Sequence, residues 1–283
     1  MRNVMITGAS SGIGRATALH LAEHGWRVFA GVRKPADGDA LVAATTGPGA
    51  LVPVICDVCD QESVDAAVAT VRSAVGSDGL HGYFSNAGIA AMSGDSSAEG
   101  TPLETLERVM SVNYIGAVRA LQGFLPLVRE AHGTVVVNSA MMTHTVLPFN
   151  AGYAPSKAAL ETWAVSLRRE IARYGVRVVI VRPAGVATEL EAKQDFSKIP
   201  TDTPYPEQAA FLRHGTEMAH QRASHPSMSP VRVAECVEAA LNGRRSRYRM
   251  TGAGHLPIWI VGNLPATMQD RILGRIVRRW TSS

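Results

Sequence analysis

The 283-residue chain is 46% hydrophobic and 18% charged, and its 28 Lys and Arg against 24 Asp and Glu give a formal charge of +4. This composition excludes an intrinsically disordered chain, and a chain of this length buries enough surface to fold without disulfides or structural metals. The late clustering of arginines could serve an anionic partner, but no nucleic-acid-binding motif accompanies it, so we interpret it as a solvated helix face.

Cys56, Cys59 and Cys236 are too few for a secreted disulfide scaffold and indicate a reducing compartment. Cys56 and Cys59 have CxxC spacing, but the sequence has no second CxxC or paired histidines, so we expect a structural role and predict no metal site. The start of the chain has no signal-peptide pattern, and the apolar run Leu256–Val261 is too short to span a bilayer. We therefore expect a cytoplasmic protein.

Short apolar or β-branched runs alternate with amphipathic stretches through the first two thirds of the chain. The predicted strands are Val4–Thr7, Arg27–Ala30, Leu51–Ile55, Gly82–Ser85, Thr134–Asn138 and Val176–Val181. The predicted helices between them are Gly14–His24, Ser63–Val75, Leu103–Arg129 and Pro155–Tyr174. Continuous apolar runs indicate strands buried on both faces, and repeated strand–helix–strand units form a parallel sheet. The pattern predicts an α/β fold with a doubly wound parallel sheet in a single domain.

The alternation ends after Thr188. Residues 189–230 carry scattered prolines around weakly helical pieces, which is typical of a substrate lid. A helix is predicted over Pro230–Asn242 and an edge strand over Tyr248–Met250. Over Leu264–Trp280, apolar residues recur at helical spacing with arginines on the other faces. That stripe predicts core packing or a subunit contact, and the alternative is peripheral contact with a membrane.

The first predicted strand leads into Thr7-Gly8-Ala9-Ser10-Ser11-Gly12-Ile13-Gly14 and then directly into a helix. Glycines at this turn let the backbone approach a pyrophosphate closely, while the helix N-terminus adds free N–H groups and a positive dipole. The spacing is GxxxGxG and differs from the GxGxxG dinucleotide fingerprint. We predict that a dinucleotide binds here, at Gly8, Ser10, Ser11, Gly12, Ile13 and Gly14.

Tyr153 and Lys157 lie four residues apart on a predicted helix, so their side chains share one face. A tyrosine with its free pKa of about 10 is a poor base, but a nearby ammonium favours tyrosinate and lowers that pKa. Tyr153 could then accept a proton from an alcohol or donate one to a carbonyl oxygen. We predict that the pair is catalytic.

Several motifs occur together in a fixed order: TGASSGIG at 7–14, Asn86-Ala87-Gly88, Asn113, and Tyr153-Ala154-Pro155-Ser156-Lys157. Over about residues 3–250 this set resembles the short-chain dehydrogenase/reductase family. The segment Val28–Arg33 and the basic C-terminal extension resemble its retinol and hydroxysteroid dehydrogenase-like branch. The resemblance implies a Rossmann-type fold, a nicotinamide cofactor and a homodimer or homotetramer.

The resemblance also implies roles for the matching residues. Lys157 would hold the nicotinamide ribose, and Asn113 would support a water-mediated proton path from Lys157, unless it is only a polar residue that kinks its helix. Asp57 and Val58 match positions that contact adenine. The other matching positions are Asn86, Ala87 and Gly88, which line the cofactor cleft or form a structural turn, and Pro183, Val186 and Thr188, from a segment over the nicotinamide.

In this family the residue that ends the second strand selects the cofactor, and an acidic residue there favours NAD. Here Val32 occupies that position and Arg33 follows it. A guanidinium suits a ribose 2′-phosphate through charge-assisted hydrogen bonds. We predict NADP(H) over NAD(H), and the alternative is that Arg33 is a solvated loop residue.

A serine that hydrogen-bonds the substrate oxygen usually stands thirteen residues before the tyrosine of the family motif. Here that position is Ala140, and Ser139 lies one residue earlier. Neighbouring strand residues point to opposite faces, so either a bulge brings Ser139 into place or the serine is absent. We assign the role to Ser139.

Together these features predict a dinucleotide-binding and catalytic domain over 1–250 and a C-terminal helical extension over 251–283. The predicted activity is hydride transfer between NADP(H) and a ketone or secondary alcohol. The apolar segment 141–149 and the lid residues Phe196, Tyr205, Phe211, Leu212 and Met218 favour a bulky hydrophobic substrate, such as a steroid-, retinoid- or acyl-like compound. The alternatives are a β-ketoacyl reductase and a non-catalytic dinucleotide-binding sensor. His144 is assigned no role.

Overall fold

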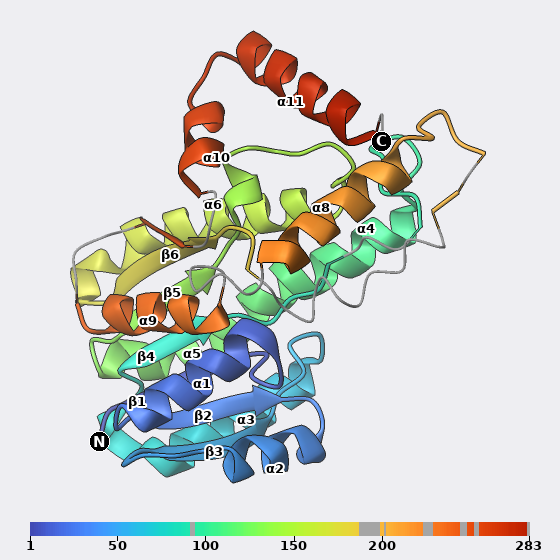
Figure 1. Ribbon diagram of the computed structural model, residues 1–283. Coiled ribbons are helices and arrows are strands. Elements are labelled where there is room, and N and C mark those ends of the chain that lie inside the picture. The colour runs from blue at the N-terminus through green and yellow to red at the C-terminus, as the bar shows by residue number, and fades with distance from the viewer. Residues whose placement is uncertain are drawn as a thin grey trace.

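The computed structural model describes residues 1–90, 94–186, 199–200, 202–222, 229–243, 248–251 and 255–281, with the backbone alone at 216, 218–222, 248–251, 255 and 258. A seven-stranded sheet forms the centre of the molecule (Figure 1). Its strands lie in the order β3 (Ala50–Ile55), β2 (Arg27–Val32), β1 (Asn3–Ile6), β4 (Gly82–Ser85), β5 (Thr134–Asn138), β6 (Arg177–Pro183) and β7 (Tyr248–Thr251). All neighbouring strands are parallel, and the direction of winding reverses between β1 and β4. The predicted doubly wound α/β fold is confirmed.

The strands follow the apolar runs of the sequence closely. Every residue of β1, β4 and β5 is buried, as continuous apolar runs predict for strands covered on both faces. The predicted edge strand is β7, which pairs with β6 at the edge of the sheet. Strand β2 extends to Val32, which pairs with Ile55, and so brings Arg33 to the carboxyl edge of the sheet.

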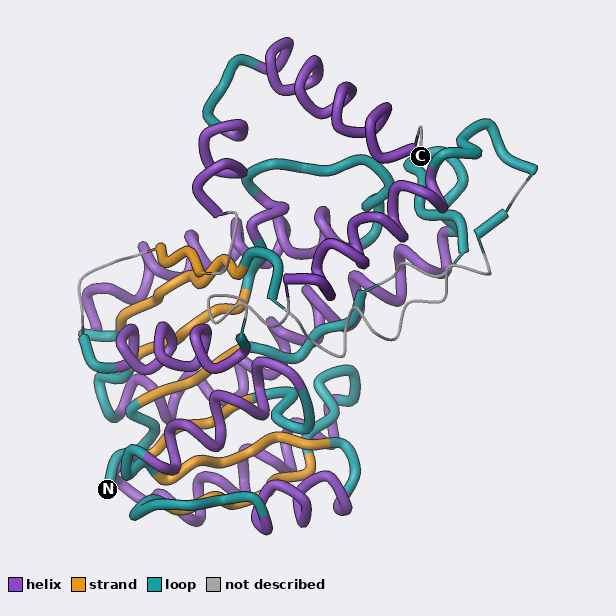
Figure 2. Tube along the Cα trace, viewed as in Figure 1, coloured by secondary structure: helices purple, strands orange, loops and turns teal. Residues whose placement is uncertain are grey.

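Two groups of helices cover the two faces of the sheet, as the purple helices on either side of the orange strands show in Figure 2. The first group is α3 (Gln61–Val75), α5 (Ala117–Glu130) and α6 (Tyr153–Ile171). The second group is α1 (Gly12–Glu23), α2 (Pro35–Ala43) and α9 (Pro230–Leu241). Each group packs its buried aliphatic side chains on one face of the sheet, so the core has two layers.

The long helix predicted over 103–129 is interrupted. It consists of α4 (Leu103–Met110), a π-helical turn (Ser111–Gly116) and α5. The turn ends at Gly116, which packs closely against the loop after β3. A Cβ on Gly116 would lie 2.9 Å from Val58 in that loop. π-helical turns are rare and often mark functional sites, and this one carries Asn113.

Helix α2 was absent from the sequence prediction. It is short, its first residue is Pro35, and only Gly38 and Leu41 are buried, so apolar periodicity is almost lacking. Its close packing depends on Gly38, because a Cβ there would lie 2.6 Å from Pro53. Tertiary contact with β3 therefore stabilises a helix that local sequence signals do not indicate.

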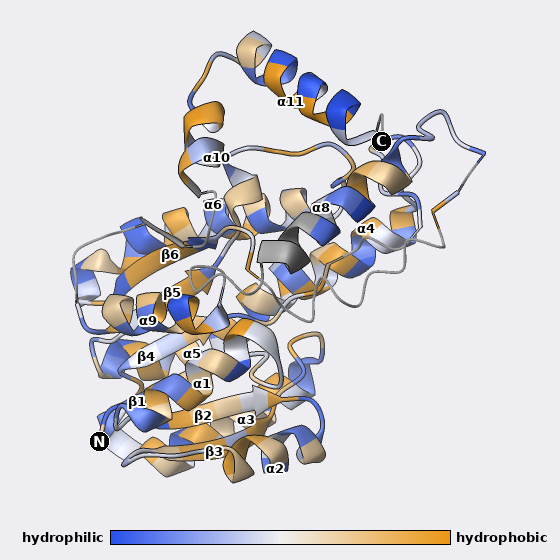
Figure 3. Cartoon of the chain, viewed as in Figure 1, coloured by the Kyte–Doolittle hydropathy of each residue, from blue (hydrophilic) through white to orange (hydrophobic). Residues whose placement is uncertain are grey.

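In the part of the chain that the structure describes, the helices beyond the sheet include α8 (Gln208–Arg222), α10 (His255–Gly262) and α11 (Ala266–Thr281). Figure 3 shows apolar and charged residues alternating around α11, and Ile276, Val277 and Trp280 on that helix pack against Phe149 and its neighbours. The core-packing interpretation is therefore confirmed for the C-terminal half of α11. Among the described residues, no helix is long and apolar enough to cross a membrane.

The expected lid is only partly described. Phe196 and the side chain of Met218 lie outside the described residues. Phe211 and Leu212 on α8 are buried beside Phe149 instead of lining the central cavity. The expectation that these two side chains cover the substrate is therefore wrong, since the aromatic cluster with Trp280 of α11 takes them up.

Candidate active site

A cavity of about 450 Å³ opens at the carboxyl ends of the strands. This is where doubly wound sheets bind ligands, because the loops diverge at the reversal between β1 and β4. The predicted site residues that line it are Gly8, Ser10, Ser11, Gly12, Ile13, Arg33, Asp57, Val58, Asn86, Ala87, Gly88, Ser139, Tyr153, Lys157, Pro183 and Val186. Gly14 and Asn113 lie behind the cavity wall, and Thr188 lies outside the described residues.

The glycine turn after β1 has the geometry that the sequence requires of it. Gly8 and Gly12 have φ of +66° and +53°, in the left-handed region that favours glycine. Gly14 is buried, and a Cβ there would lie 2.1 Å from the Gly8 carbonyl oxygen. Gly14 therefore lets the turn fold against α1 and does not itself line the cavity.

The residues at this turn fit the pyrophosphate of a dinucleotide. Helix α1 begins at Gly12, and the Ser11 side chain does not cap the first N–H groups. The N-terminus of α1 therefore lies at the cavity with its free N–H groups and the positive end of the helix dipole, and both favour the binding of a phosphate. At the end of β5, Asn138 Oδ1 is buried without a hydrogen-bond partner among the described residues, so it can accept a donor from a bound ligand.

Asn86 follows β4 directly, and its side chain connects the end of β4 to the turn after β1. Its Nδ2 donates to the carbonyl oxygens of Thr7 (3.1 Å) and Gly8 (3.0 Å), and its Oδ1 accepts from Asn138 Nδ2 at 2.9 Å. These bonds join β1, β4 and β5 at the edge of the cavity. Asn86 therefore forms a structural turn and also lines the cavity, where its contact with a cofactor stays a prediction.

Arg33 lies at the end of β2 and is exposed on the cavity wall, whereas Val32 is buried. No described acidic side chain forms an ion pair with Arg33. Asp57 lies in the loop after β3 and also lines the cavity. It accepts a hydrogen bond from Cys59 N at 2.9 Å. The end of β2 therefore presents a cation to the cavity.

The CxxC motif, Cys56 to Cys59, lines this part of the cavity. Burial, together with the charge of Asp57, raises the pKa of Cys56 to about 12. Cys56 therefore stays a protonated thiol at neutral pH, which makes it a poor nucleophile and a poor metal ligand. Cys59 is exposed, and neither cysteine forms a disulfide.

Tyr153 and Lys157 begin helix α6 and both line the cavity. Lys157 Nζ lies 5.8 Å from the centre of the Tyr153 ring and donates to the Asn138 carbonyl oxygen at 2.9 Å. Only 3% of Lys157 is exposed, and desolvation lowers its pKa from 10.5 to about 8. The structure therefore brings the predicted pair together, with a buried amine beside a phenol.

Asn113 is fully buried behind this pair. Its side chain bonds both the N–H (2.8 Å) and the carbonyl oxygen (2.9 Å) of Ile89 and donates to Ser156 Oγ at 3.0 Å. A Cβ on Gly88 would lie 3.1 Å from Asn113 Oδ1 and 3.4 Å from Lys157 Nζ. Asn113 thus holds the π-helical turn against α6 and the segment after β4, close to the Lys157 amine.

The assignment of Ser139 to the substrate oxygen does not fit the structure. Ser139 Oγ donates to Glu161 Oε2 at 2.7 Å, so its hydroxyl is directed to a carboxylate on α6. Ala140, in extended conformation, holds the position thirteen residues before Tyr153 and offers no donor. The physical reason is strand alternation: neighbouring residues face opposite sides, and no bulge turns Ser139 around.

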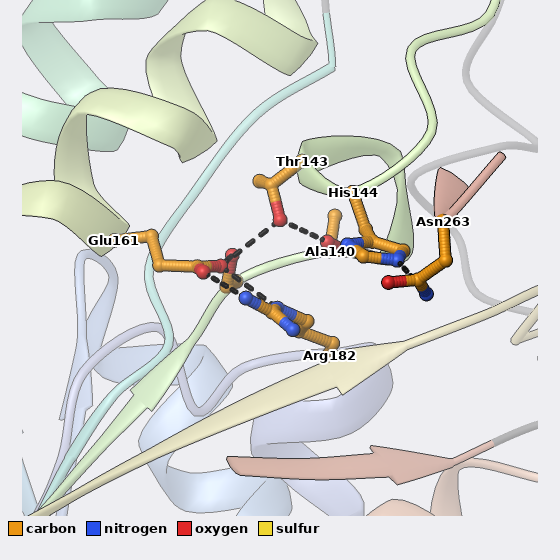
Figure 4. A network of polar contacts seen from close by, with 7 residues as sticks. Ala140, Thr143, His144, Glu161, Arg182 and Asn263 are labelled. Atoms are coloured by element: carbon orange, nitrogen blue, oxygen red, sulfur yellow. Dashed lines mark hydrogen bonds and ion pairs between the residues drawn. The ribbon is translucent and has the colours of Figure 1, made fainter. Parts of the chain in front are cut away.

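Glu161 is the centre of a polar network that the sequence analysis missed (Figure 4). It pairs with Arg182 of β6, and Thr143 Oγ1 lies 2.9 Å from its Oε2. Burial raises the pKa of Glu161, but hydrogen bonds from Arg182, Ser139 and Thr143 outweigh it and hold that pKa below its usual range. The available signal was Glu161 itself, a carboxylate one turn after Lys157 on the buried face of α6.

Comparison with known proteins agrees with this geometry. The family model described as short chain dehydrogenase matches residues 2–198. Retinol dehydrogenase 5 of Homo sapiens is 32% identical over 285 residues, covering 95% of this chain and 87% of that protein. The 17-beta-hydroxysteroid dehydrogenase type 6 of Bos taurus is also 32% identical, covering 96% and 87%. The solved structure of levodione reductase superposes with a TM-score of 0.74 at 25% identity, covering 89% of this chain and 96% of that chain. The chain therefore belongs to the short-chain dehydrogenase/reductase family and is an oxidoreductase that acts on alcohols or ketones with NAD(P).

Proposed function

We propose that this protein reduces bulky hydrophobic ketones, or oxidises the corresponding secondary alcohols, with NADP(H). The observation that carries the proposal is the placement of Tyr153 and Lys157 in one cavity with the glycine turn and Arg33. Tyr153 as proton donor, Arg33 as cation and the N-terminus of α1 as phosphate-binding group therefore line the same cavity.

NADP(H), when bound, supplies or takes up the hydride. Tyr153 donates the proton to the carbonyl oxygen in reduction and accepts it from the alcohol in oxidation. Lys157 is positively charged below its pKa of about 8, and a cation beside the phenol favours its ionised form. Asn113 positions the Lys157 side of the cavity through Ile89 and Ser156.

The choice of NADP(H) rests on the end of β2. An acidic side chain there would repel a 2′-phosphate, whereas Val32 is buried and Arg33 is exposed toward the cavity. A guanidinium forms strong paired hydrogen bonds with phosphate oxygens.

The substrate class rests on the wall between β5 and α6. Met141, Met142 and Leu147 contribute apolar surface to the cavity beside Tyr153. Two relatives that align with almost the whole chain are named for retinol and for a 17-beta-hydroxysteroid, which are hydrophobic alcohols. Flexible methionines suit large apolar ligands because they repack around different shapes.

The test is a panel of ketones followed by the loss of NADPH or NADH absorbance. Steroid and retinoid carbonyls should have kcat/KM at least about tenfold above small polar ketones, since each buried methylene contributes about tenfold or more. NADPH should exceed NADH for the same ketone. Equal kcat/KM with both cofactors would remove the NADP(H) assignment, and a preference for small polar ketones would remove the substrate class.

A further inference from the structure

The substrate side of the cavity needs a hydrogen-bond donor in addition to Tyr153. Negative charge develops on the carbonyl oxygen as it is reduced, and a fixed donor aimed at that oxygen stabilises the transition state. Ala140 has no donor, and the Ser139 hydroxyl is bonded to Glu161. The donor must therefore come from another part of this wall.

Asn150 lies three residues before Tyr153, lines the cavity and is only 7% exposed. Its Oδ1 accepts from Ala154 N, in the first turn of α6, at 3.0 Å. This bond fixes the orientation of the amide, because the end that accepts from a backbone N–H must be the oxygen. The NH₂ group is thereby directed away from the helix backbone.

The partner of that NH₂ group is a weak one. Asn150 Nδ2 lies 2.8 Å from Met142 Sδ, and Met142 also lines the cavity. A thioether sulfur is a weak hydrogen-bond acceptor, whereas a carbonyl or alkoxide oxygen is a strong one. An unbranched methionine side chain can move aside at little cost when a better acceptor arrives.

The backbone before Asn150 is held in an unfavourable conformation. Phe149 has φ of +58°, which is rare for a bulky residue. Its ring packs edge-on against Phe211 and Tyr205, with centroids 5.5 and 6.3 Å away, so the surrounding cluster holds this conformation in place. Strain that packing maintains is found most often at functional sites, and here it sets the direction in which the chain enters Asn150.

We infer that Asn150 is a catalytic residue whose Nδ2 donates a hydrogen bond to the substrate oxygen beside Tyr153, in place of Met142 Sδ. The role rests on the proposed function and adds no covalent step. Asn150 stabilises the oxygen, and Tyr153 alone exchanges the proton with it.

The variant Asn150→Asp separates this role from a structural one. Aspartate keeps the size of asparagine and an oxygen that accepts from Ala154 N, but its ionised form has no donor. We expect kcat to fall about 10²–10³-fold, as when one donor to a developing oxyanion is removed. Cofactor affinity, measured by titration of NADPH fluorescence, should stay within a few-fold of the wild type. The ratio of variant to wild-type kcat should also rise toward low pH, since a protonated carboxyl again has a donor.

A second variant keeps the test decisive if the charge weakens folding. Adding Ala140→Ser to Asn150→Asp places a hydroxyl on the other wall and should recover at least about tenfold of the lost kcat, which a purely structural role would not permit. Asn242→Asp is the matched control, because Asn242 is exposed, bonds Arg2 and does not line the cavity, and it should leave kcat within a few-fold of the wild type.

Two results overturn the inference. One is an active Asn150→Asp enzyme with unchanged kcat. The other is a variant whose activity falls only in step with melting temperature and cofactor affinity, with no rescue by Ala140→Ser. A wild type that is inactive on the whole panel overturns the proposed function instead, and the role of Asn150 with it.

Discussion

The two halves of the cavity are built in different ways. The half beside β1, β2 and β4 is made largely of backbone: a glycine turn, a helix end and the Asn86 bonds between strands. The half beside β5 and β6 depends on side-chain partnerships. Ser139 and Asn150 line the cavity, and Glu161 with Arg182 supports Ser139 from outside the lining. Backbone geometry tolerates little change, whereas side-chain partnerships can be rearranged one residue at a time.

This difference separates the features that dinucleotide binding requires in general from the features that are specific to this protein. The cofactor half presents phosphate-binding geometry that any dinucleotide of this class requires. The substrate half has Ala140 where a serine hydroxyl was expected, and its polar groups are organised around Glu161 instead. Specificity for this protein's own substrate should therefore reside between β5 and α6.

The largest effect on kcat is expected at Tyr153, where the cofactor half and the substrate half of the cavity meet. Tyr153→Phe removes the proton-transferring hydroxyl but keeps the ring that packs near Lys157, so kcat should fall about 10²–10⁴-fold. Cofactor affinity should be nearly unchanged, as titration of NADPH fluorescence would show. If the variant retained more than a tenth of wild-type kcat, Tyr153 would not be the proton donor.

The cofactor half is tested by Gly14→Ala. The new Cβ would lie 2.1 Å from the Gly8 carbonyl oxygen, so the turn must move and NADPH affinity should fall about 10²-fold. Gly274→Ala on α11 is the matched control, because its Cβ would meet nothing within 4 Å and helix propensity favours alanine. Equal NADPH affinity in the two variants would contradict the view that backbone packing forms this half.

The same contrast explains which features the sequence predicted. The glycine turn, the strands β1 to β6 and the pair Tyr153 and Lys157 depend on local spacing, and the structure contains all of them. Helix α2 lacks apolar periodicity, so its sequence did not indicate it. The bond from Ser139 to Glu161 joins residues 22 positions apart, and only tertiary packing decides which way that serine faces. Phe211 and Leu212 looked like lid residues because their apolar character does not reveal which partner buries them.

The burial of Lys157, to which we assign a catalytic role, has a cost in stability. Its pKa is about 8 in the folded protein and 10.5 in the unfolded chain, so folding is penalised while the amine is charged in both states, below pH 8. Lys157→Met should therefore raise the free energy of unfolding at pH 7 by up to about 3 kcal/mol while abolishing turnover. The advantage over the wild type should shrink between pH 8 and 10.5, as the buried amine loses its proton. Melting temperatures of both proteins across this range measure it, and a less stable variant at pH 7 would contradict it.

Cofactor choice tests the charged side chain that the cofactor half presents at the end of β2. Arg33→Ala removes the cation at the end of β2, and hydrogen bonds to charged groups contribute about 1.5–3 kcal/mol. The kcat/KM for NADPH should therefore fall about 10- to 100-fold, while the value for NADH serves as the internal control and should change little. A parallel loss with both cofactors would mean that Arg33 does not distinguish the 2′-phosphate.

The smallest effect on turnover is expected at Ser139, where the initial sequence assignment failed. Ser139→Ala removes the 2.7 Å bond to Glu161 but leaves Arg182 and Thr143 to satisfy that carboxylate. Stability should fall by about 1–3 kcal/mol, because the bond is made to a charged group, while kcat stays within a few-fold of the wild type. Thermal unfolding and steady-state kinetics on the same preparation separate the two quantities. A large loss of kcat at unchanged melting temperature would instead place the Ser139 hydroxyl on the substrate oxygen, and the substrate half would then resemble the family pattern after all.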